Sequence, residues 1–328
     1  MSKKVTISVS GGAGQIAYSL LPRLARGELT GDARVTLRLL EIPAILKSLE
    51  GVKMELEDLA SPFLDRVVCT SDNEEAFGDA NFVFLLGGKP RGKGMERKDL
   101  IRDNGPIFTS QGAAIGKAAA KDVRVLVVAN PCNTNCLIAA HNAPNVPKER
   151  WAAMMRLDHN RAQSQLAMKA VAAAGAVTKM TIWGNHSATQ YPDTEHAMID
   201  GKPAREVIKD RAWLDKDFVN IVQQRGKAII DARGLSSATS AASAAIDHMR
   251  DSLRATAAGD WVSAAVWSDG SYGVPEGIFC GYPVTYDAHG AWKIVPGLKH
   301  DENGQAMLKA TIAELVDERD TVKDLLKG

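Results

Sequence analysis

Short apolar runs alternate, in the first half of the chain, with longer segments whose apolar positions recur at helical spacing. Strands are predicted at the β-branched or continuously apolar residues 5–10, 34–40, 67–70, 82–86 and 123–129. Helices are predicted between them, at residues 15–26, 45–59 and 100–120. Because strands that alternate with helices pair in parallel through right-handed crossovers, this half is predicted to be an α/β domain with a doubly wound parallel sheet.

The second half has a different pattern, in which long alanine-rich helices precede strands. Helices are predicted at residues 160–174, 215–233, 236–256 and 304–326, and strands at residues 261–268 and 278–286. This order indicates an α+β domain with a core of its own. We therefore expect one domain at residues 1–153 and a second at residues 154–328, although no Pro/Gly/Ser-rich linker marks their junction.

Composition places the chain among ordinary globular proteins and excludes disordered and fibrous classes. Of its 328 residues, 45% are hydrophobic and 24% are charged, and a net charge of +1 gives no overall field that would attract nucleic acid or an anionic membrane. No apolar run is long enough to span a bilayer or to serve as a signal peptide. Four scattered cysteines do not suggest a disulfide framework. A cytoplasmic protein without membrane or nucleic-acid partners is predicted.

A glycine-rich turn follows the first predicted strand. Gly11, Gly14 and Ala17 are spaced so that a tight turn exposes backbone N–H groups to a pyrophosphate at the start of a helix. A plain tight turn is the alternative interpretation. Glu41 ends the second strand, 27 residues beyond Gly14, where a carboxylate can accept from both ribose hydroxyls of an adenosine and would repel a 2′-phosphate. These residues favour NAD over NADP, unless Glu41 is only a solvated acid.

A basic loop at residues 89–99 follows the fourth predicted strand. It carries five basic and two acidic residues among several glycines, which predicts a mobile cationic lid at the edge of the sheet where ligands bind. A solvated run of charges is one alternative. A nucleic-acid patch is another, but no aromatic residue is interleaved with the charges.

Asp158, Arg161 and His186 are the candidates for acid–base chemistry in the second half. Asp158 and Arg161 can share one face of the first turn of a helix, and His186 lies in a polar loop. A carboxylate beside an imidazole is the arrangement of a general base. The alternatives are a helix cap, a surface arginine and a solvated histidine. The other histidines are interpreted as structural or surface residues: His141, His159, His196, His248, His289 and His300.

Seven segments in order along the chain carry a family resemblance. They are residues 11–20, 40–43, 54–58, 90–100, 130–135, 156–161 and 184–187. Together they resemble the bacterial and cytosolic-like malate dehydrogenases of the lactate/malate dehydrogenase family. The resemblance implies a Rossmann-type NAD-binding domain followed by an α+β substrate-binding domain, and the reversible oxidation of (S)-malate to oxaloacetate, a step of the tricarboxylic acid cycle.

Specific roles follow from the resemblance. His186 would donate and accept the proton, with Asp158 as its orienting partner. Arg161 would bind the C1 carboxylate of the substrate and Arg97 would polarise its C2 carbonyl. Arg91 would bind the distal carboxylate, and it decides the substrate because lactate dehydrogenases typically carry glutamine at that position.

The resemblance also implies a wider set of contacts. Asn130 and Ser240 would lie beside the substrate. The implied NAD contacts are Gly11, Gly12, Ala13, Gly14, Gln15, Ile16, Ala17, Glu41, Asn104, Gln111, Val128, Ala129 and Asn130. No metal is required for catalysis, and the helix at residues 52–58 would lie in the interface of a homodimer. A dehydrogenase for another 2-oxo acid, such as lactate, and a catalytically silent NAD-binding module remain the alternatives.

Overall fold

The computed structural model describes residues 4–89, 94 and 96–326, and the chain divides into two compact units. The first unit contains Met1–Ala153 together with Ala238–Ile246 and Glu318–Gly328. The second contains Met154–Ser237 and Asp247–Asp317. Two short segments that are distant in sequence therefore belong with the N-terminal part of the chain.

A six-stranded parallel arrangement forms the centre of the first unit, in the spatial order β6-β5-β4-β1-β2-β3. Its strands are β1 (Lys4–Ser10), β2 (Arg34–Leu40), β3 (Leu64–Thr70), β4 (Phe82–Leu85), β5 (Arg124–Val127) and β6 (Trp151–Ala153). Its central strands bury Ile7, Leu37 and Phe84 completely, as expected for strands that helices cover on both faces.

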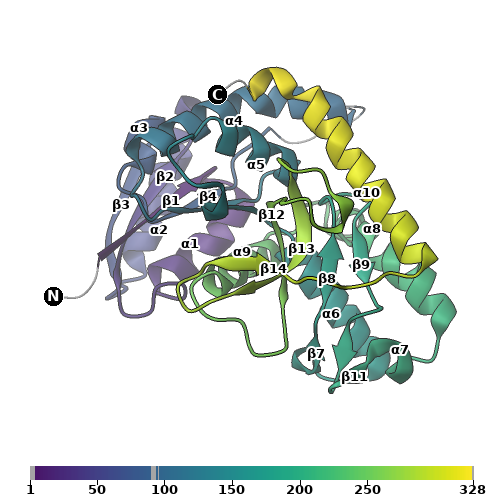
Figure 1. Cartoon of the computed structure of the whole chain (residues 1–328). Coiled ribbons are helices and arrows are strands. Elements are labelled where there is room, and N and C mark those ends of the chain that lie inside the picture. Colours follow the sequence, from purple (N-terminus) through teal and green to yellow (C-terminus); the bar gives the residue numbers. More distant parts are fainter. Residues whose placement is uncertain (1–3, 90–93, 95, 327–328) are drawn as a thin grey trace. The chain divides into compact units, whose positions relative to one another are not determined.

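Helices cover both faces of this sheet, with α1 and α2 on one side and α3, α4 and α5 on the other (Figure 1). The helical segments of the unit are α1 (Gln15–Ala25), η1 (Pro43–Ile45), α2 (Leu46–Asp58), α3 (Asn73–Phe77), α4 (Arg97–Ala118), α5 (Cys132–His141), η2 (Lys148–Arg150) and η6 (Lys323–Leu325). Helix α9 (Thr239–Asp251) contributes its first half, and Arg23 Nη1 of α1 donates to Ser243 Oγ at 2.6 Å.

Antiparallel strands dominate the second unit. The strand groups are β12 (Val262–Trp267) with β13 (Phe279–Tyr286) and β14 (Trp292–Ile294), then β8 (Thr181–Trp183) with β9 (Tyr191–Asp193), and β7 (Val177–Thr178) with β10 (Met198–Ile199) and β11 (Lys202–Pro203). The helical segments are α6 (Arg156–Ala170), η3 (Ala174–Ala176), α7 (Ala204–Val207), the π-helical η4 (Trp213–Asp217), α8 (Phe218–Arg233), η5 (Ser271–Gly273) and α10 (Glu302–Thr321), which enters the first unit at Glu318. Trp183, Tyr282 and Leu308 are among the side chains of its core.

The predicted fold class is confirmed, and the main differences concern element ends, short strands and the helices α3, α5 and α7, which the sequence pattern did not predict. The helix predicted at residues 304–326 runs from Glu302 to Thr321, and the one predicted at 236–256 is confined to Thr239–Asp251. Strands β6 to β11 and β14 were not predicted, because two or three residues are too few to show an alternating pattern. No helix among the described residues has the length and apolar character of a membrane span.

Candidate active site

The carboxyl ends of four parallel strands are level with one another at one edge of the first unit's sheet. Ser10 of β1 pairs with Leu40 of β2 and Leu85 of β4, and Leu85 pairs with Val127 of β5. The glycine turn, Glu41, the basic loop and residues 128–130 therefore all begin at the same edge. Ligands of doubly wound sheets bind beyond this edge.

Gly11 permits a close approach of two backbones at this edge. Its φ is +69°, and a Cβ there would lie 2.7 Å from the Cα of Gly87. The N–H groups of Gly11 and Gly12 both donate to the carbonyl of Leu40, at 2.9 and 3.2 Å. Only glycine satisfies both the positive φ and the contact, so the turn is held close to β4 and β2 without a side chain in the way.

The N-terminus of α1 is suited to an anion. Gly14 is its N-cap residue and provides no side-chain cap, and its first turn contains no acidic residue. Because the first N–H groups of a helix lack acceptors within the helix, and the helix dipole is positive there, a pyrophosphate fits this end. Gln15 is exposed, Ile16 is half-buried, and Ala17 is buried against the sheet.

Glu41 directly follows β2 and lies beside the turn. One carboxylate oxygen accepts the Ala13 N–H and the other accepts the Ile42 N–H, both at 3.2 Å. These bonds fix the carboxylate next to the helix N-terminus and leave it further acceptor capacity. The turn and Glu41 together fit the pyrophosphate and ribose of a dinucleotide.

Asn104 contacts the start of the basic loop. Its buried side-chain oxygen accepts the Lys89 N–H at 2.8 Å, and its amide nitrogen donates to the carbonyls of Lys89 and Leu100. This side chain therefore holds the backbone at Lys89, the first residue of the loop. Gln111, further along α4, is also buried, and among the described residues its Oε1 has no hydrogen-bond partner. A buried acceptor without a partner can accept a hydrogen bond from a ligand or from a water molecule.

The segment after β5 is fixed through its backbone. The N–H groups of Val128 and Ala129 both donate to the carbonyl of Leu85, at 2.9 and 3.0 Å. Asn130 is exposed, and the peptide bond between Asn130 and Pro131 is cis. Ser240 is exposed in the first turn of α9, within the first unit.

Arg97, the first residue of α4, is paired with a carboxylate that the sequence analysis did not single out. Its Nε donates to Glu318 Oε1 at 2.6 Å, and Glu318 also accepts from the hydroxyl of Thr134. The Glu318 side chain is only 3% exposed, whereas that of Arg97 is 30% exposed. Among the described residues, Nη2 of Arg97 has no hydrogen-bond partner. Arg91, the residue expected to decide the substrate, lies outside the described residues.

The second unit brings Asp158, Arg161 and His186 together. Asp158 is fully buried in the first turn of α6, and one of its carboxylate oxygens is in contact with Nδ1 of His186. The other oxygen accepts from Nη1 of Arg161 at 3.1 Å and from Nε2 of Gln190 at 3.4 Å. Gln190 was missed by the sequence analysis because no local pattern distinguishes it.

Strand β8 and helix α10 fix the loop that carries His186. After β8 the backbone of Gly184 exchanges two hydrogen bonds with Gly281 of β13, at 3.0 and 2.7 Å. The Asn185 N–H then donates to Thr311 Oγ1 at 2.8 Å, and its side-chain amide donates to Glu314 Oε2 at 2.9 Å. The two residues that precede the histidine are therefore anchored to β13 and to α10.

The charges in this cluster support an ionised Asp158. Burial alone would raise the pKa of the Asp158 carboxyl, but the charge and hydrogen bond of His186, together with the charge of Arg161, lower the pKa below its ordinary value. Nη2 of Arg161 donates to Ser237 Oγ at 3.0 Å, which fixes the plane of the guanidinium. The cluster contains a carboxylate-oriented imidazole beside an oriented arginine, which suits proton transfer at a carboxylate-bearing substrate.

Comparison with known proteins agrees with these features. The family model for the lactate/malate dehydrogenase NAD binding domain matches residues 4–152, and that for the alpha/beta C-terminal domain of the same family matches residues 155–326. The chain belongs to the lactate/malate dehydrogenase family. It is an NAD-dependent oxidoreductase of this family, and NAD is its cofactor.

Solved structures of the family include both kinds of dehydrogenase. A malate dehydrogenase from Naegleria fowleri is 48% identical, with a TM-score of 0.95 and coverage of 99% of both chains. A Trichomonas vaginalis lactate dehydrogenase in complex with NADH and oxamate is 35% identical, with a TM-score of 0.94 and coverage of 98% of this chain and 99% of that one. The overall likeness therefore does not by itself distinguish the two substrates.

Proposed function

We propose that this family member is a malate dehydrogenase, which interconverts (S)-malate and oxaloacetate. The observation that carries the proposal is the arginine at position 91 of the sequence, in the basic loop. A cation there favours a substrate with a second carboxylate. Pyruvate has only one carboxylate, so its binding would leave the Arg91 charge without a partner. The 48% identity to the Naegleria fowleri malate dehydrogenase supports the same substrate.

His186 accepts and donates the proton of the C2 hydroxyl. With Nδ1 against the Asp158 carboxylate, that nitrogen keeps its proton and Nε2 is left to act on the substrate. In the direction of malate oxidation, Nε2 takes the proton of the C2 hydroxyl, and the ionised Asp158 stabilises the imidazolium that forms. When bound, NAD accepts the hydride that leaves C2.

The arginines bind and orient the substrate. Arg161, whose plane is fixed by Asp158 and Ser237, binds the C1 carboxylate through paired N–H donors. Arg97 donates to the C2 oxygen, whose negative charge grows as oxaloacetate is reduced. Its Nη2 can make this bond while Nε remains paired with Glu318.

Replacement of Arg91 by glutamine tests the substrate assignment. We expect kcat/KM for oxaloacetate to fall by about 100-fold or more in Arg91→Gln, while activity with pyruvate rises relative to oxaloacetate. Arg102→Gln removes an exposed arginine from α4 and is the matched control, expected to leave both values unchanged. A lactate dehydrogenase, the alternative favoured by the 35% identity to the Trichomonas vaginalis enzyme, would keep its substrate preference in Arg91→Gln.

We also propose that the enzyme is a homodimer that uses α2 in its interface. Tyr18 of α1 and Met54 of α2 are 51% and 61% exposed, and a groove of about 350 Å³ lies between these helices, lined in part by Tyr18 and Val52. Light scattering after gel filtration should give twice the 35.2 kDa chain mass, and Met54→Glu should shift the protein toward the single-chain mass. A single-chain mass for the unmodified protein at micromolar concentration would contradict the dimer. Location in the cytoplasm and a role in the tricarboxylic acid cycle stay predictions.

A further inference from the structure

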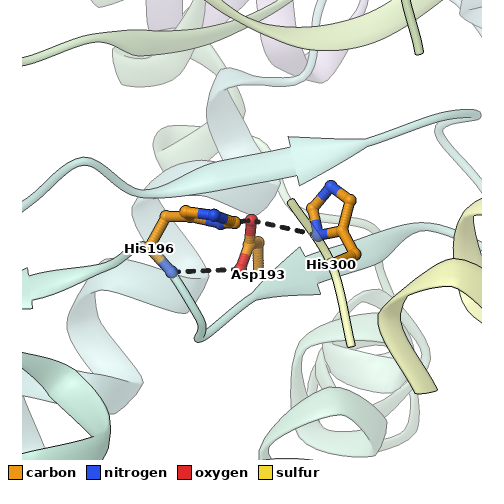
Figure 2. A group of neighbouring side chains, drawn as sticks. All are labelled: Asp193, His196 and His300. Atoms are coloured by element: carbon orange, nitrogen blue, oxygen red, sulfur yellow. Dashed lines mark hydrogen bonds and ion pairs between the residues drawn. The ribbon is translucent and has the colours of Figure 1, made fainter. Parts of the chain in front are cut away.

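Two histidines and an aspartate meet in the second unit, apart from His186 and its partners. Asp193 ends β9, His196 follows it in the next turn, and His300 lies just before α10. Figure 2 shows the two imidazoles on either side of the Asp193 carboxylate. Nδ1 of His196 lies 2.7 Å from Asp193 Oδ2 and Nδ1 of His300 lies 4.0 Å from it. One ligand-type atom from each residue lies within 4.8 Å of the other two.

The side chain of His300 is buried without the hydrogen bonds that a buried imidazole requires. Its side chain is 4% exposed, and among the described residues neither ring nitrogen has a hydrogen-bond partner. Leaving a buried polar atom without a partner is costly, so such an atom calls for a water, an ion or another ligand. Nδ1 of His300 lies 4.0 Å from the Asp193 carboxylate. This nitrogen, which lacks a hydrogen-bond partner among the described residues, therefore belongs to the same cluster as Asp193 and His196.

We propose that Asp193, His196 and His300 form a binding site for a divalent transition metal, with Zn²⁺ as the preferred ion. Carboxylate oxygen and imidazole nitrogen are zinc ligands, at about 2.0–2.2 Å from the metal. Tetrahedral geometry at those bond lengths separates neighbouring ligand atoms by about 3.3 Å. The distances of 2.7 and 4.0 Å from Asp193 Oδ2 lie on either side of this value. Small rotations of the two imidazoles are therefore enough to form the site.

The Asp193 carboxylate is already held by a second layer of contacts. Nε1 of the buried Trp183 donates to Oδ2 at 3.0 Å, and Oδ1 accepts the backbone N–H groups of Glu195 and His196 at 2.7 and 3.3 Å. Contacts of this kind fix the orientation of a metal ligand and increase its affinity. Trp183 also lies edge-on to His300, with ring centroids 4.9 Å apart, so the indole contacts two of the three ligands.

The charges around the cluster suit a dication. Oε1 of Glu195 lies 3.5 Å from His300 Nδ1 and adds a second carboxylate beside Asp193. Arg205 is the nearby cation, and it is shared between Glu195 and Asp301, at 3.6 and 3.1 Å. Two carboxylates near the metal position can neutralise Zn²⁺, while Arg205 is balanced by Asp301.

Metal binding here would connect β9 to the segment that leads into α10. Helix α10 provides Thr311 and Glu314, which anchor the loop of His186. Because the three ligands come together only in the folded chain, an ion bound to them stabilises the folded state by mass action. The site touches neither His186 nor Asp158, so the ion has a structural role and the inference is independent of the substrate.

Calorimetric titration of the chelator-treated, full-length protein with ZnCl₂ tests the site directly. We expect one ion per chain with micromolar or tighter affinity, and Co²⁺ in its place should give the intense visible absorption of a four-coordinate centre. His300→Asn and His196→Asn should each lose at least ten-fold in affinity. His289→Asn, which removes an exposed histidine elsewhere in the same unit, is the matched control and should bind like the unmodified protein.

Thermal unfolding provides a second readout. Zn²⁺ should raise the Tm of the unmodified protein and of His289→Asn, and should leave the Tm of His300→Asn unchanged. Failure of the unmodified protein to bind Zn²⁺ or Co²⁺ would overturn the proposal, even if the histidine variants did not fold. Equal affinity of His300→Asn and His289→Asn would also overturn it, because the ion would then be bound elsewhere.

Discussion

Gly184 lies directly against the side chain of Thr311 in α10. The φ of Gly184 is +87°, and a Cβ at this position would come within 2.1 Å of Thr311 Cγ2. Oγ1 of the same threonine accepts the N–H of Asn185, the residue before His186. The position of His186, the residue proposed to transfer the proton, therefore depends on the glycine at position 184 and on the Thr311 hydroxyl, which is distant in sequence.

Gly184→Ala is expected to damage both stability and activity. The added methyl group meets Thr311 and an L-residue is strained at this φ, so we expect a loss of about 2–4 kcal/mol in the free energy of unfolding. Displacement of His186 should also reduce kcat by about ten-fold or more. Urea unfolding and steady-state kinetics measure the two effects. Gly175→Ala, at an exposed position with no atom within 4 Å of the added Cβ, is the control. Equal stability of the two variants would contradict the steric argument.

Replacement of either member of the acid–base pair should abolish turnover and spare cofactor binding. We expect His186→Asn and Asp158→Asn to lower kcat by about 1,000-fold or more, since the first removes the proton acceptor and the second removes the group that orients it. NADH affinity, measured by fluorescence titration, should change by less than about two-fold, because the NAD-binding domain is the other part of the chain. An equal loss of NADH binding and turnover would argue against the proton-transfer role.

Glu41 should determine the preference for NAD over NADP. Its carboxylate is held beside the Ala13 N–H, and a 2′-phosphate placed near it would be repelled. We expect Glu41→Ser to reduce the ratio of kcat/KM for NADH to that for NADPH by about ten-fold or more. Glu57→Gln, at an exposed position of α2, removes a similar charge and should leave the ratio unchanged. An unaltered ratio in Glu41→Ser would remove Glu41 from the specificity argument.

Acid should destabilise the protein through two buried histidines of the second unit. Burial lowers the pKa of His248 from 6.5 to about 3, helped by the charge of Arg156. Burial also lowers the pKa of His159 well below its ordinary value. Between pH 6.5 and the lowered pKa values, the unfolded chain binds protons that the folded chain does not, so stability rises with pH and falls as the pH decreases.

The pH dependence can be assigned to one residue. Each such histidine contributes a slope of up to about 1.4 kcal/mol per pH unit below pH 6.5. In urea unfolding at several pH values between 4 and 7, His248→Gln should show a shallower decline with acid than the unmodified protein. His289→Asn, at an exposed position, should keep the full slope. Parallel curves for His248→Gln and the unmodified protein would show that His248 does not titrate as its burial requires.

The local sequence pattern was sufficient to predict the main strands and the site residues that lie in recognisable turns. Gly11 and Glu41 follow apolar runs long enough to identify as strands, and parallel pairing brings their positions to one edge. Asp158 and Arg161 are one helical turn apart, so their proximity follows from helix geometry.

Contacts between distant segments could not be predicted in this way. The partner of Arg97 is 221 residues away, at Glu318, in a helix whose charged residues look alike in sequence. The sequence alone indicates no chemical role for His300, because its neighbours Asp193 and His196 are brought to it only by the packing of β9 against the segment before α10. Such contacts depend on the tertiary fold and leave no periodic signal in the sequence.

The oxidation of NADH and of NADPH, each followed by absorbance with oxaloacetate and with pyruvate, tests the central claim most directly. We predict rapid oxidation only with oxaloacetate and NADH, because in the proposed function Arg91 favours a second carboxylate and Glu41 repels a 2′-phosphate. Preference for pyruvate would contradict the malate dehydrogenase assignment, and no oxidation with either substrate, with NADH still bound, would contradict catalysis itself.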